Sequence, residues 1–189
     1  METKLRCAWC EKDDLYRNYH DNEWGKPVYD DATIFEFLIL ETFQAGLSWY
    51  TVLAKRENFR KAFDNFDLLK VANYSENKMA ELAEDAGIIR NKLKIKATVT
   101  NAQAFIKVQE EFGSFSKYIW GFVDGKPIDN QPKTISEVKA TTPISDALSK
   151  DLKKRGFKFV GSTVMYAHMQ ATGMVNDHIT ECFTRKITI

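Results

Sequence analysis

Apolar residues recur at helical spacing along most of this chain, and glycines separate the segments in which they recur. A period of about 3.6 residues predicts amphipathic α-helices, and a glycine just after the last periodic residue is typical of a helix end. The expected helices run from Asp30 or Asp31 to Gly46, Ser48 to Phe63, Ser75 to Gly87, Asn91 to Gly113, Ser145 to Gly156 and about Thr163 to Gly173. The stretch Val123–Pro143 holds three of the four prolines and is expected to be an extended loop. Only Phe157–Val160 has a strand-like pattern, and this segment is too short to form the basis of a sheet. We therefore predict an all-α fold.

Size and charge narrow the class of protein. The 189 residues suffice for a single domain, 1–189, or for two helical lobes that share a core. A formal net charge of +1 requires that any surface for a polyanion be a local patch. The start of the chain, Met1–Trp9, lacks the apolar stretch of a signal peptide, and the most apolar run, Ile34–Leu40, is too short to span a membrane. Three cysteines, an odd number, argue against a disulfide framework, so we expect a cytoplasmic protein without a membrane segment.

Five soft or borderline ligands lie near the two ends of the chain: Cys7, Cys10, His20, His178 and Cys182. His178 and Cys182 are four residues apart, so a helical turn would aim both at one ion. Cys7 and Cys10 form a Cys-x-x-Cys pair, which is half of a zinc site, a redox pair or two unrelated thiols. Two cysteines and two histidines would make a closed structural site that fastens one end of the chain to the other. The spacing does not choose between Cys7 and Cys10.

Aromatic and acidic residues form a second candidate group. Tyr16 and Tyr19 are three apart on an expected short helix, with Trp9 before them and Trp24 after them. Such rings either fill a core or stack on planar ligands. Glu41 lies in a helix that is apolar nearly all round, about 140° away from Glu36, the residue expected to face solvent. It is therefore either exposed near the helix end at Gly46 or a buried carboxylate that requires a partner.

Cations gather at two glycine turns. Arg90, Lys92, Lys94 and Lys96 follow Gly87, and Lys150, Lys153, Lys154, Arg155 and Lys158 surround Gly156. Charge clusters of this kind are commonly solvated helix faces. A glycine turn, a helix terminus and cations together are also the parts that hold phosphate, so both turns are candidate contacts for nucleic acid.

Six blocks carry a resemblance that runs from Cys7 to about Cys182. They are Tyr19-His20-Asp21-Asn22-Glu23-Trp24-Gly25, Glu41 with Gln44-Ala45-Gly46-Leu47-Ser48-Trp49, Asp85-Ala86-Gly87-Ile88-Ile89-Arg90, Ser145-Asp146-Ala147-Leu148-Ser149-Lys150, Arg155-Gly156-Phe157-Lys158-Phe159-Val160-Gly161, and Val175-Asn176-Asp177-His178 with Cys182. Together, and in this order, they resemble the 3-methyladenine DNA glycosylase I family.

The resemblance implies a helix-hairpin-helix glycosylase fold, with the active site between two helical lobes and a structural zinc ion. It carries over the zinc ligands Cys7, His20, His178 and Cys182, and the base-recognition residues Glu41, Tyr16, Tyr19, Trp9 and Trp49. Leu47 would be the apolar wedge that enters the base stack. Contacts to the DNA backbone are expected from Gly87, Arg90, Lys92, Lys153, Lys154 and Arg155. The hairpin, placed around Ala86–Asn91, departs from the usual Gly-hydrophobic-Gly pattern, since Ile89 stands where a second glycine is expected.

The activity that the resemblance implies is hydrolysis of the N-glycosidic bond of 3-methyladenine in damaged double-stranded DNA. The products would be the free base and an abasic site, formed by a monomer without strand cleavage. The family lacks the catalytic aspartate of related glycosylases, so the positive charge of the alkylated base would make it a good leaving group. Two alternatives remain: a zinc-stapled nucleic-acid-binding module without catalysis, and a glycosylase that also nicks the strand. Glu41 argues against the first, because a carboxylate in a binding face repels phosphate.

Overall fold

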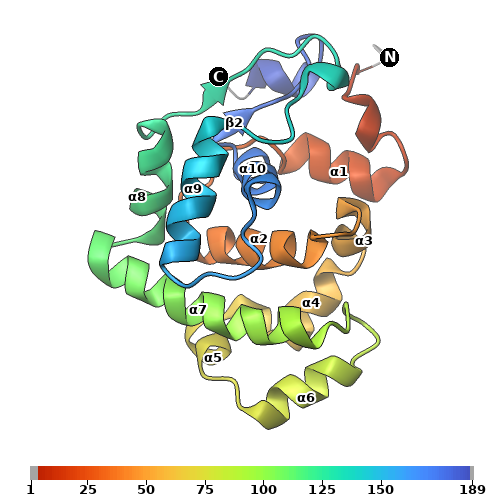
Figure 1. Ribbon diagram of the computed structural model, residues 1–189. Helices are drawn as coiled ribbons and strands as arrows, with labels where there is room; N and C mark the ends of the chain where they lie inside the picture. Colours follow the sequence, from red (N-terminus) through yellow and green to blue (C-terminus); the bar gives the residue numbers. More distant parts are fainter. Residues whose placement is uncertain (1–3, 188–189) are drawn as a thin grey trace.

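The computed structural model describes residues 4–187, and most of them are helical (Figure 1). The α-helices are α1 (Asp14–Asn22), α2 (Asp31–Gln44), α3 (Trp49–Leu53), α4 (Arg56–Ala62), α5 (Leu68–Ala72), α6 (Glu76–Glu84), α7 (Lys92–Phe112), α8 (Phe115–Trp120), α9 (Pro143–Lys154) and α10 (Ser162–Ala171). Short 3₁₀-helices are η1 (Ala8–Cys10), η2 (Asp64–Phe66), η3 (Gly121–Val123), η4 (Ile135–Glu137) and η5 (Phe183–Ile187). The mostly helical architecture confirms the helical character of the predicted fold.

Local signals at helix ends account for the boundaries that were predicted best. The Asp30 side chain accepts a hydrogen bond from the Thr33 amide at the start of α2, and Asn91 caps α7 in the same way. At the other end of α7, Gly113 has a φ of +82°, a left-handed conformation that glycine adopts without strain. Both helices therefore begin and end within about two residues of the glycine and cap positions read from the sequence.

One expected helix, Ser48 to Phe63, is divided into α3 and α4. The break lies at Lys55, whose backbone is not helical and whose ammonium donates to the carbonyls of Ala86 and Gly87 at 3.1 and 3.2 Å. Arg56, the first residue of α4, is buried and pairs with Glu23 and Glu36. Contacts with distant parts of the chain thus fix a bend that apolar spacing does not reveal.

Two other expectations were wrong. Gly87 does not end a helix: α6 stops at Glu84, and the Gly87 amide donates to the Asp85 carboxylate at 2.7 Å in the turn that follows. Phe157–Val160 is not a strand, because side chains on α7 and α9, rather than a neighbouring strand, bond its backbone. In the described part of the chain the strands are β1 (Ile128–Asp129) and β2 (Val175–Asn176), which pair in parallel.

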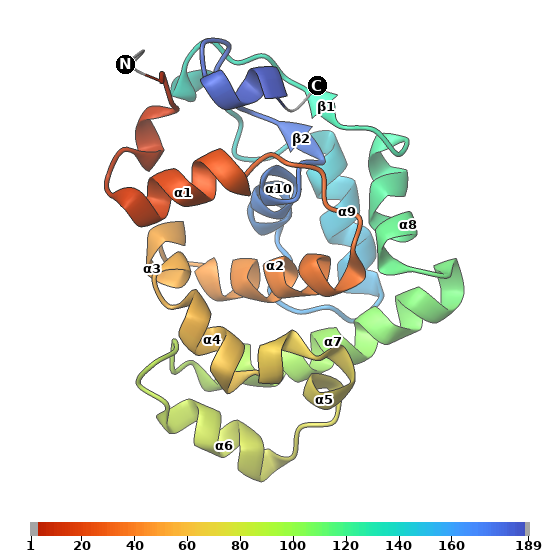
Figure 2. The ribbon, with the colours of Figure 1, turned by 180° about the vertical axis from the view of Figure 1, so that it is seen from behind.

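Helix α2 lies at the centre of the molecule. It contacts α3, α7, α8 and α10, and its side chains from Phe37 to Phe43 are all buried (Figures 1 and 2). No helix within residues 4–187 has the length and apolarity needed to cross a membrane. Because α2 is buried on nearly every side, a polar side chain on it must face either a partner or a cavity.

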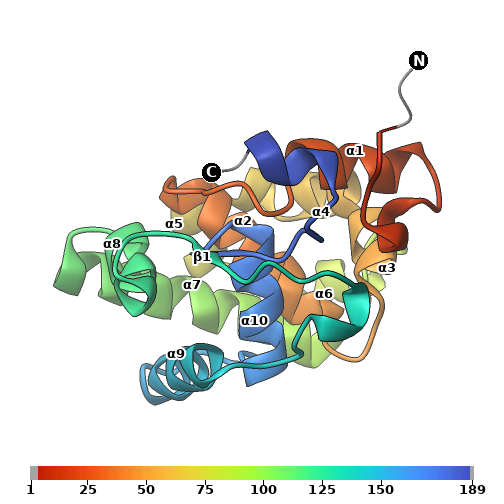
Figure 3. The ribbon, with the colours of Figure 1, turned by 90° about the horizontal axis from the view of Figure 1, so that it is seen from above.

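The two ends of the chain meet above this core. The Phe183 amide donates to the Leu5 carbonyl at 2.9 Å, and η5 and the N-terminal segment lie at the same end of the molecule (Figures 2 and 3). This arrangement brings residues that are more than 150 positions apart in the sequence into one cluster, described below.

Candidate active site

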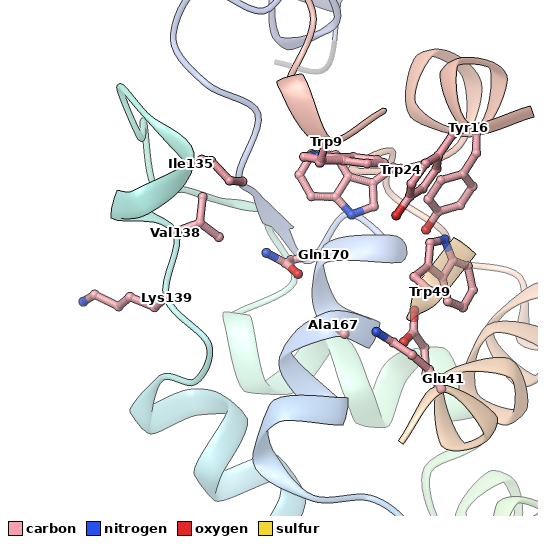
Figure 4. A pocket seen from close by; sticks show the side chains of 12 residues that line it. Trp9, Tyr16, Trp24, Glu41, Trp49, Ile135, Val138, Lys139, Ala167 and Gln170 are labelled. Atoms are coloured by element: carbon pink, nitrogen blue, oxygen red, sulfur yellow. The ribbon is translucent and has the colours of Figure 1, made fainter. Parts of the chain in front are cut away.

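A cavity of about 260 Å³ opens beside α2 (Figure 4). Its walls come from the N-terminal segment with α1, from α2, α3 and α10, and from the segment that contains η4. The lining residues are Trp9, Tyr16, Tyr19, Trp24, Glu41, Gln44, Trp49, Ile135, Val138, Lys139, Ala167 and Gln170. All five of the predicted base-recognition residues therefore line one cavity, although their role in binding a base is not tested by this geometry.

Glu41 forms part of the cavity wall and is only 2% exposed. Its carboxylate points toward Trp49, and its Oε2 has no hydrogen-bond partner among the described residues (Figure 4). Burial raises the pKa of this carboxyl group well above its ordinary value. Of the two readings of Glu41, exposure at the helix end is thereby excluded. The residue is a buried acid that faces an open cavity.

The aromatic side chains stand around this acid. Trp9 and Tyr16 pack edge to face with ring centroids 4.9 Å apart, and Tyr19 and Trp49 lie 5.4 Å apart at a tilt. The indole Nε1 of Trp49 is buried without a hydrogen-bond partner among residues 4–187. Burial also raises the pKa of the Tyr16 and Tyr19 hydroxyls above its ordinary value. The cavity wall thus offers flat apolar surfaces and two buried polar atoms, Glu41 Oε2 and Trp49 Nε1, without a partner among the described residues.

Seven lining residues were not among the predicted site residues. Gln44 lies three positions after Glu41 on α2, and Ala167 and Gln170 are three apart on α10, so helical spacing could have suggested them. Ile135, Val138 and Lys139 come from the long loop between β1 and α9 and have no periodic signal. Trp24, the seventh, was noted in the aromatic group but assigned no role.

Four potential metal ligands meet where the chain ends come together. The ligand atoms of Cys7, His20, His178 and Cys182 all lie within 4.8 Å of one another, and all four residues are buried. Cys182 Sγ lies 3.5 Å from His20 Nε2 and 3.6 Å from His178 Nδ1. His178 and Cys182 are brought together by a turn that leads into η5, not by the helical turn expected from their spacing.

The structure decides between the two N-terminal cysteines. Cys7 belongs to the cluster, with its Sγ 3.8 Å from His178 Nδ1. The Cys10 thiol is buried outside it and donates to the Cys7 carbonyl at 3.1 Å. The predicted four-residue set is therefore the one that the fold assembles, and this set could hold a metal ion.

Further contacts orient the two imidazoles. His20 Nδ1 lies 2.8 Å from Asp21, whose carboxylate is held in turn by Arg6, so His20 Nε2 is left to face the cluster. His178 Nε2 lies 3.1 Å from the Trp24 carbonyl, which leaves Nδ1 facing the cluster. Such partners fix the tautomer of metal-binding histidines. The hydrogen bond from Cys7, and then those from His178 and His20, lower the pKa of the Cys182 thiol.

The residues expected to contact DNA differ in their surroundings. Leu47 is 43% exposed beside the Gly46 turn, and Arg90, Lys92, Lys153 and Lys154 are exposed. Gly87 lies in the turn between α6 and α7. Arg155 pairs with Glu111 and Asp151, so part of its charge is compensated within the protein. Their contacts to DNA stay predictions.

Lys94, by contrast, does not belong to a solvent-facing basic cluster. It is 5% exposed, and its ammonium donates to the carbonyls of Phe43 and Ala45 at 2.8 and 2.6 Å. These carbonyls are at the C-terminal end of α2, where a cation is favoured. Desolvation lowers the pKa of this lysine. The sequence reading of Lys94 as part of a phosphate-facing group was therefore wrong.

Comparisons with known proteins identify the family. The model of the methyladenine glycosylase family matches residues 9–185. The chain is 51% identical over 177 residues to DNA-3-methyladenine glycosylase 1 of Escherichia coli (strain K12), covering 94% of this chain and 95% of that one. It is 45% identical to DNA-3-methyladenine glycosylase of Haemophilus influenzae, covering 94% and 96% of the two chains.

Solved structures agree with this assignment. A crystal structure of 3-methyladenine DNA glycosylase I superimposes with a TM-score of 0.91 at 50% identity, covering 95% of this chain and 98% of that chain. A structure of the Staphylococcus aureus enzyme, which describes its recognition of 3-methyladenine, gives 0.92 at 38% identity with 95% and 96% covered. The resemblance read from the six sequence blocks is confirmed, and the chain belongs to the methyladenine glycosylase family.

Proposed function

We propose that this protein hydrolyses the N-glycosidic bond of 3-methyladenine in alkylated DNA and releases the free base. The observation that carries the proposal is Glu41, a buried carboxyl group whose Oε2 has no partner within residues 4–187 and which faces an aromatic-walled cavity. The relatives named above are DNA-3-methyladenine glycosylases, and one solved structure holds 3-methyladenine.

The cavity suits a flat base that carries positive charge. Trp9, Tyr16, Tyr19 and Trp49 can hold such a base by stacking and by cation–π attraction. A cation close to Glu41 favours the ionised carboxylate and so opposes the effect of burial on its pKa. Glu41 can then accept a hydrogen bond from the exocyclic amine of the base. To reach this position, the nucleotide must leave the duplex stack.

The leaving group supplies much of the driving force in this mechanism. Glu41 is the only carboxylate among the twelve described residues that line the cavity. In this mechanism it binds the base and does not activate water. An N3-methylated adenine departs as a neutral molecule from a cationic nucleotide, so no proton donor is required. Water attacks the sugar carbon, and an abasic site remains.

We also propose that the enzyme does not cleave the strand. Lys139 lines the outer part of the cavity, but its side chain extends away from Glu41 and the aromatic residues (Figure 4). A lyase step needs an amine that attacks the sugar carbon at the centre of the site. Incubation with borohydride and lesion-containing DNA should trap no covalent complex.

We propose that the cysteine–histidine cluster binds one structural zinc ion. Tetrahedral zinc with ordinary bond lengths places a cysteine sulfur and a histidine nitrogen about 3.6 Å apart. Three of the four cysteine–histidine pairs in the cluster have sulfur–nitrogen distances of 3.5, 3.6 and 3.8 Å. Four protein ligands close the site, so the ion would stabilise the joined chain ends and take no part in hydrolysis.

DNA would lie across the turns that carry the exposed cations. We propose that the turn between α6 and α7, with Gly87, Arg90 and Lys92, acts as the hairpin that holds the backbone, in a helix-hairpin-helix arrangement. Leu47 would enter the base stack at the lesion. Lys153 and Lys154 would contact phosphate, with a smaller contribution from Arg155, whose charge is partly compensated by Glu111 and Asp151. We further propose a cytoplasmic monomer that acts on duplex DNA.

The test is the identity of the released bases. DNA treated with a methylating agent is incubated with the protein, and the free bases are measured by mass spectrometry. We expect 3-methyladenine, with essentially no uracil or hypoxanthine from DNA that contains those lesions. Tight binding to methylated DNA without release of any base would instead support the non-catalytic nucleic-acid-binding module.

A further inference from the structure

The turn between α9 and α10 exposes an aromatic residue in an unusual conformation. Phe159 has a φ of +57°, in the left-handed region that a bulky side chain rarely adopts. Its side chain is nevertheless 38% exposed. A strained backbone at an exposed aromatic residue calls for a reason other than packing.

Phe66 provides the comparison within the same chain. It has nearly the same φ, +56°, but it is only 2% exposed and its ring stacks on Phe63 in the core. Burial of the Phe66 ring offsets the unfavourable backbone conformation. Phe159 is 38% exposed and lies outside the core cluster, so packing compensates for this conformation less completely than it does at Phe66.

Buried polar side chains hold the chain on both sides of Phe159. Asn101, fully buried on α7, accepts from the Lys158 amide at 2.8 Å and donates to the Lys158 carbonyl at 3.1 Å. Ser149, also buried, donates to the Val160 carbonyl at 2.6 Å. The residues before and after Phe159 are therefore fixed, and the ring is presented at the surface in a set direction.

Lys94 connects Phe159 to the turn that carries Leu47. The Lys94 ammonium lies 5.9 Å from the centre of the Phe159 ring and 2.6 Å from the Ala45 carbonyl, two residues before Leu47. The turn of Phe159 directly follows the exposed cations Lys153 and Lys154 at the end of α9. An exposed flat ring beside cations is typical of surfaces that bind nucleic acid by stacking and by phosphate attraction.

We propose that Phe159 is a second wedge, which stacks on the bases next to the flipped nucleotide while Leu47 enters the gap. This inference rests on the proposed glycosylase function. When a nucleotide leaves the stack, the faces of its neighbours lose their partner, and an inserted side chain restores part of the contact. Because the backbone around Phe159 is fixed in the free protein, little further ordering of the chain is needed on binding.

The test uses a duplex with a stable abasic analogue flanked by 2-aminopurine, whose emission rises when it unstacks. Phe159→Ala and Phe159→Trp are compared with wild type, and Leu69→Ala on α5, where Leu69 is 66% exposed, is the matched control. Duplex affinity is measured by fluorescence anisotropy, and affinity for free 3-methyladenine by calorimetry. Phe159→Ala should weaken binding to the analogue duplex by about tenfold or more and change the 2-aminopurine emission. Phe159→Trp and Leu69→Ala should bind as wild type does.

Three results would overturn the proposal. The first is a Phe159→Ala protein that binds the analogue duplex as tightly as wild type. The second is a Phe159→Ala protein whose affinity falls equally for undamaged duplex, or whose affinity for the free base falls. Either result would make Phe159 a general or structural contact. The third is a Phe159→Trp protein that binds the analogue duplex as weakly as Phe159→Ala does. Failure of the wild-type protein to release base from methylated DNA would contradict the proposed function and not the role of Phe159 in duplex binding.

Discussion

Replacing Glu41 by glutamine tests the base-recognition role directly. In the described structure Glu41 Oε2 is buried and has no hydrogen-bond partner, so a base bound in the cavity can supply one. Glutamine keeps the shape but removes the charge and places an NH₂ group where one carboxylate oxygen stood. Loss of one charge-assisted hydrogen bond costs about 1–3 kcal/mol. That range corresponds to a roughly 5- to 150-fold weaker affinity for free 3-methyladenine.

The same substitution should not harm the fold. Burial raises the pKa of Glu41 because the folded protein disfavours its ionised form, so a neutral amide should leave the melting temperature unchanged or higher. Titration calorimetry with the free base and differential scanning calorimetry measure the two quantities. Glu110→Gln, at an exposed position on α7, is the matched control. Equal affinities of wild type and Glu41→Gln for the base would refute the recognition role.

Three further changes have expected outcomes. Cys182→Ser should lose the zinc that elemental analysis detects, and its melting temperature should fall strongly while its turnover well below that temperature changes little. Cys10→Ser should retain the metal. Loss of zinc in Cys10→Ser but not in Cys182→Ser would disprove the ligand set. The double charge reversal Lys153→Glu and Lys154→Glu should weaken binding to damaged and undamaged duplex alike and reduce its salt dependence, and unchanged affinity at low salt would make these lysines bystanders. Burial lowers the pKa of His168 from 6.5 to about 3, so the unfolded chain holds an additional proton between those values and stability falls as the pH falls. When the pH is lowered from 7 to 4, the free energy of unfolding measured with urea should fall by about 3 kcal/mol more for wild type than for His168→Leu. Equal decreases for the two proteins would exclude the shifted pKa.

The parts of the fold that local chemistry controls were predictable from the sequence. Asn91 and Gly113 mark the two ends of α7, because a capping side chain and a left-handed glycine act within one helical turn. The break between α3 and α4 was not predictable. It depends on hydrogen bonds from Lys55 to carbonyls more than 30 residues away. A helical pattern alone does not contain that information.

Some features of the candidate site were likewise predictable from the sequence, whereas others depend on the folded chain. The identities of Glu41 and the tyrosines could be read from the sequence, but the direction in which Glu41 points depends on how α2 is surrounded. Residue spacing alone left Cys7 and Cys10 as alternatives; the family resemblance favoured Cys7, and the folded chain places Cys7 beside His178, at the other end of the chain. The wall around Ile135 comes from a loop without regular spacing, and only the folded chain brings it to the cavity.

The buried ammonium of Lys94 has a consequence for how a lesion is located. It joins the first turn of α7, next to the proposed backbone-holding hairpin, to the end of α2, three residues beyond Glu41. Two hydrogen bonds from this one buried side chain thus link the proposed backbone-holding hairpin to the end of the helix that carries Glu41. We expect this link to limit changes in the distance between hairpin and cavity, so that the DNA deforms when a nucleotide enters the cavity. A normal base pair resists that deformation more than a weakened one does, so we expect the stability of a pair to influence which nucleotides reach the cavity.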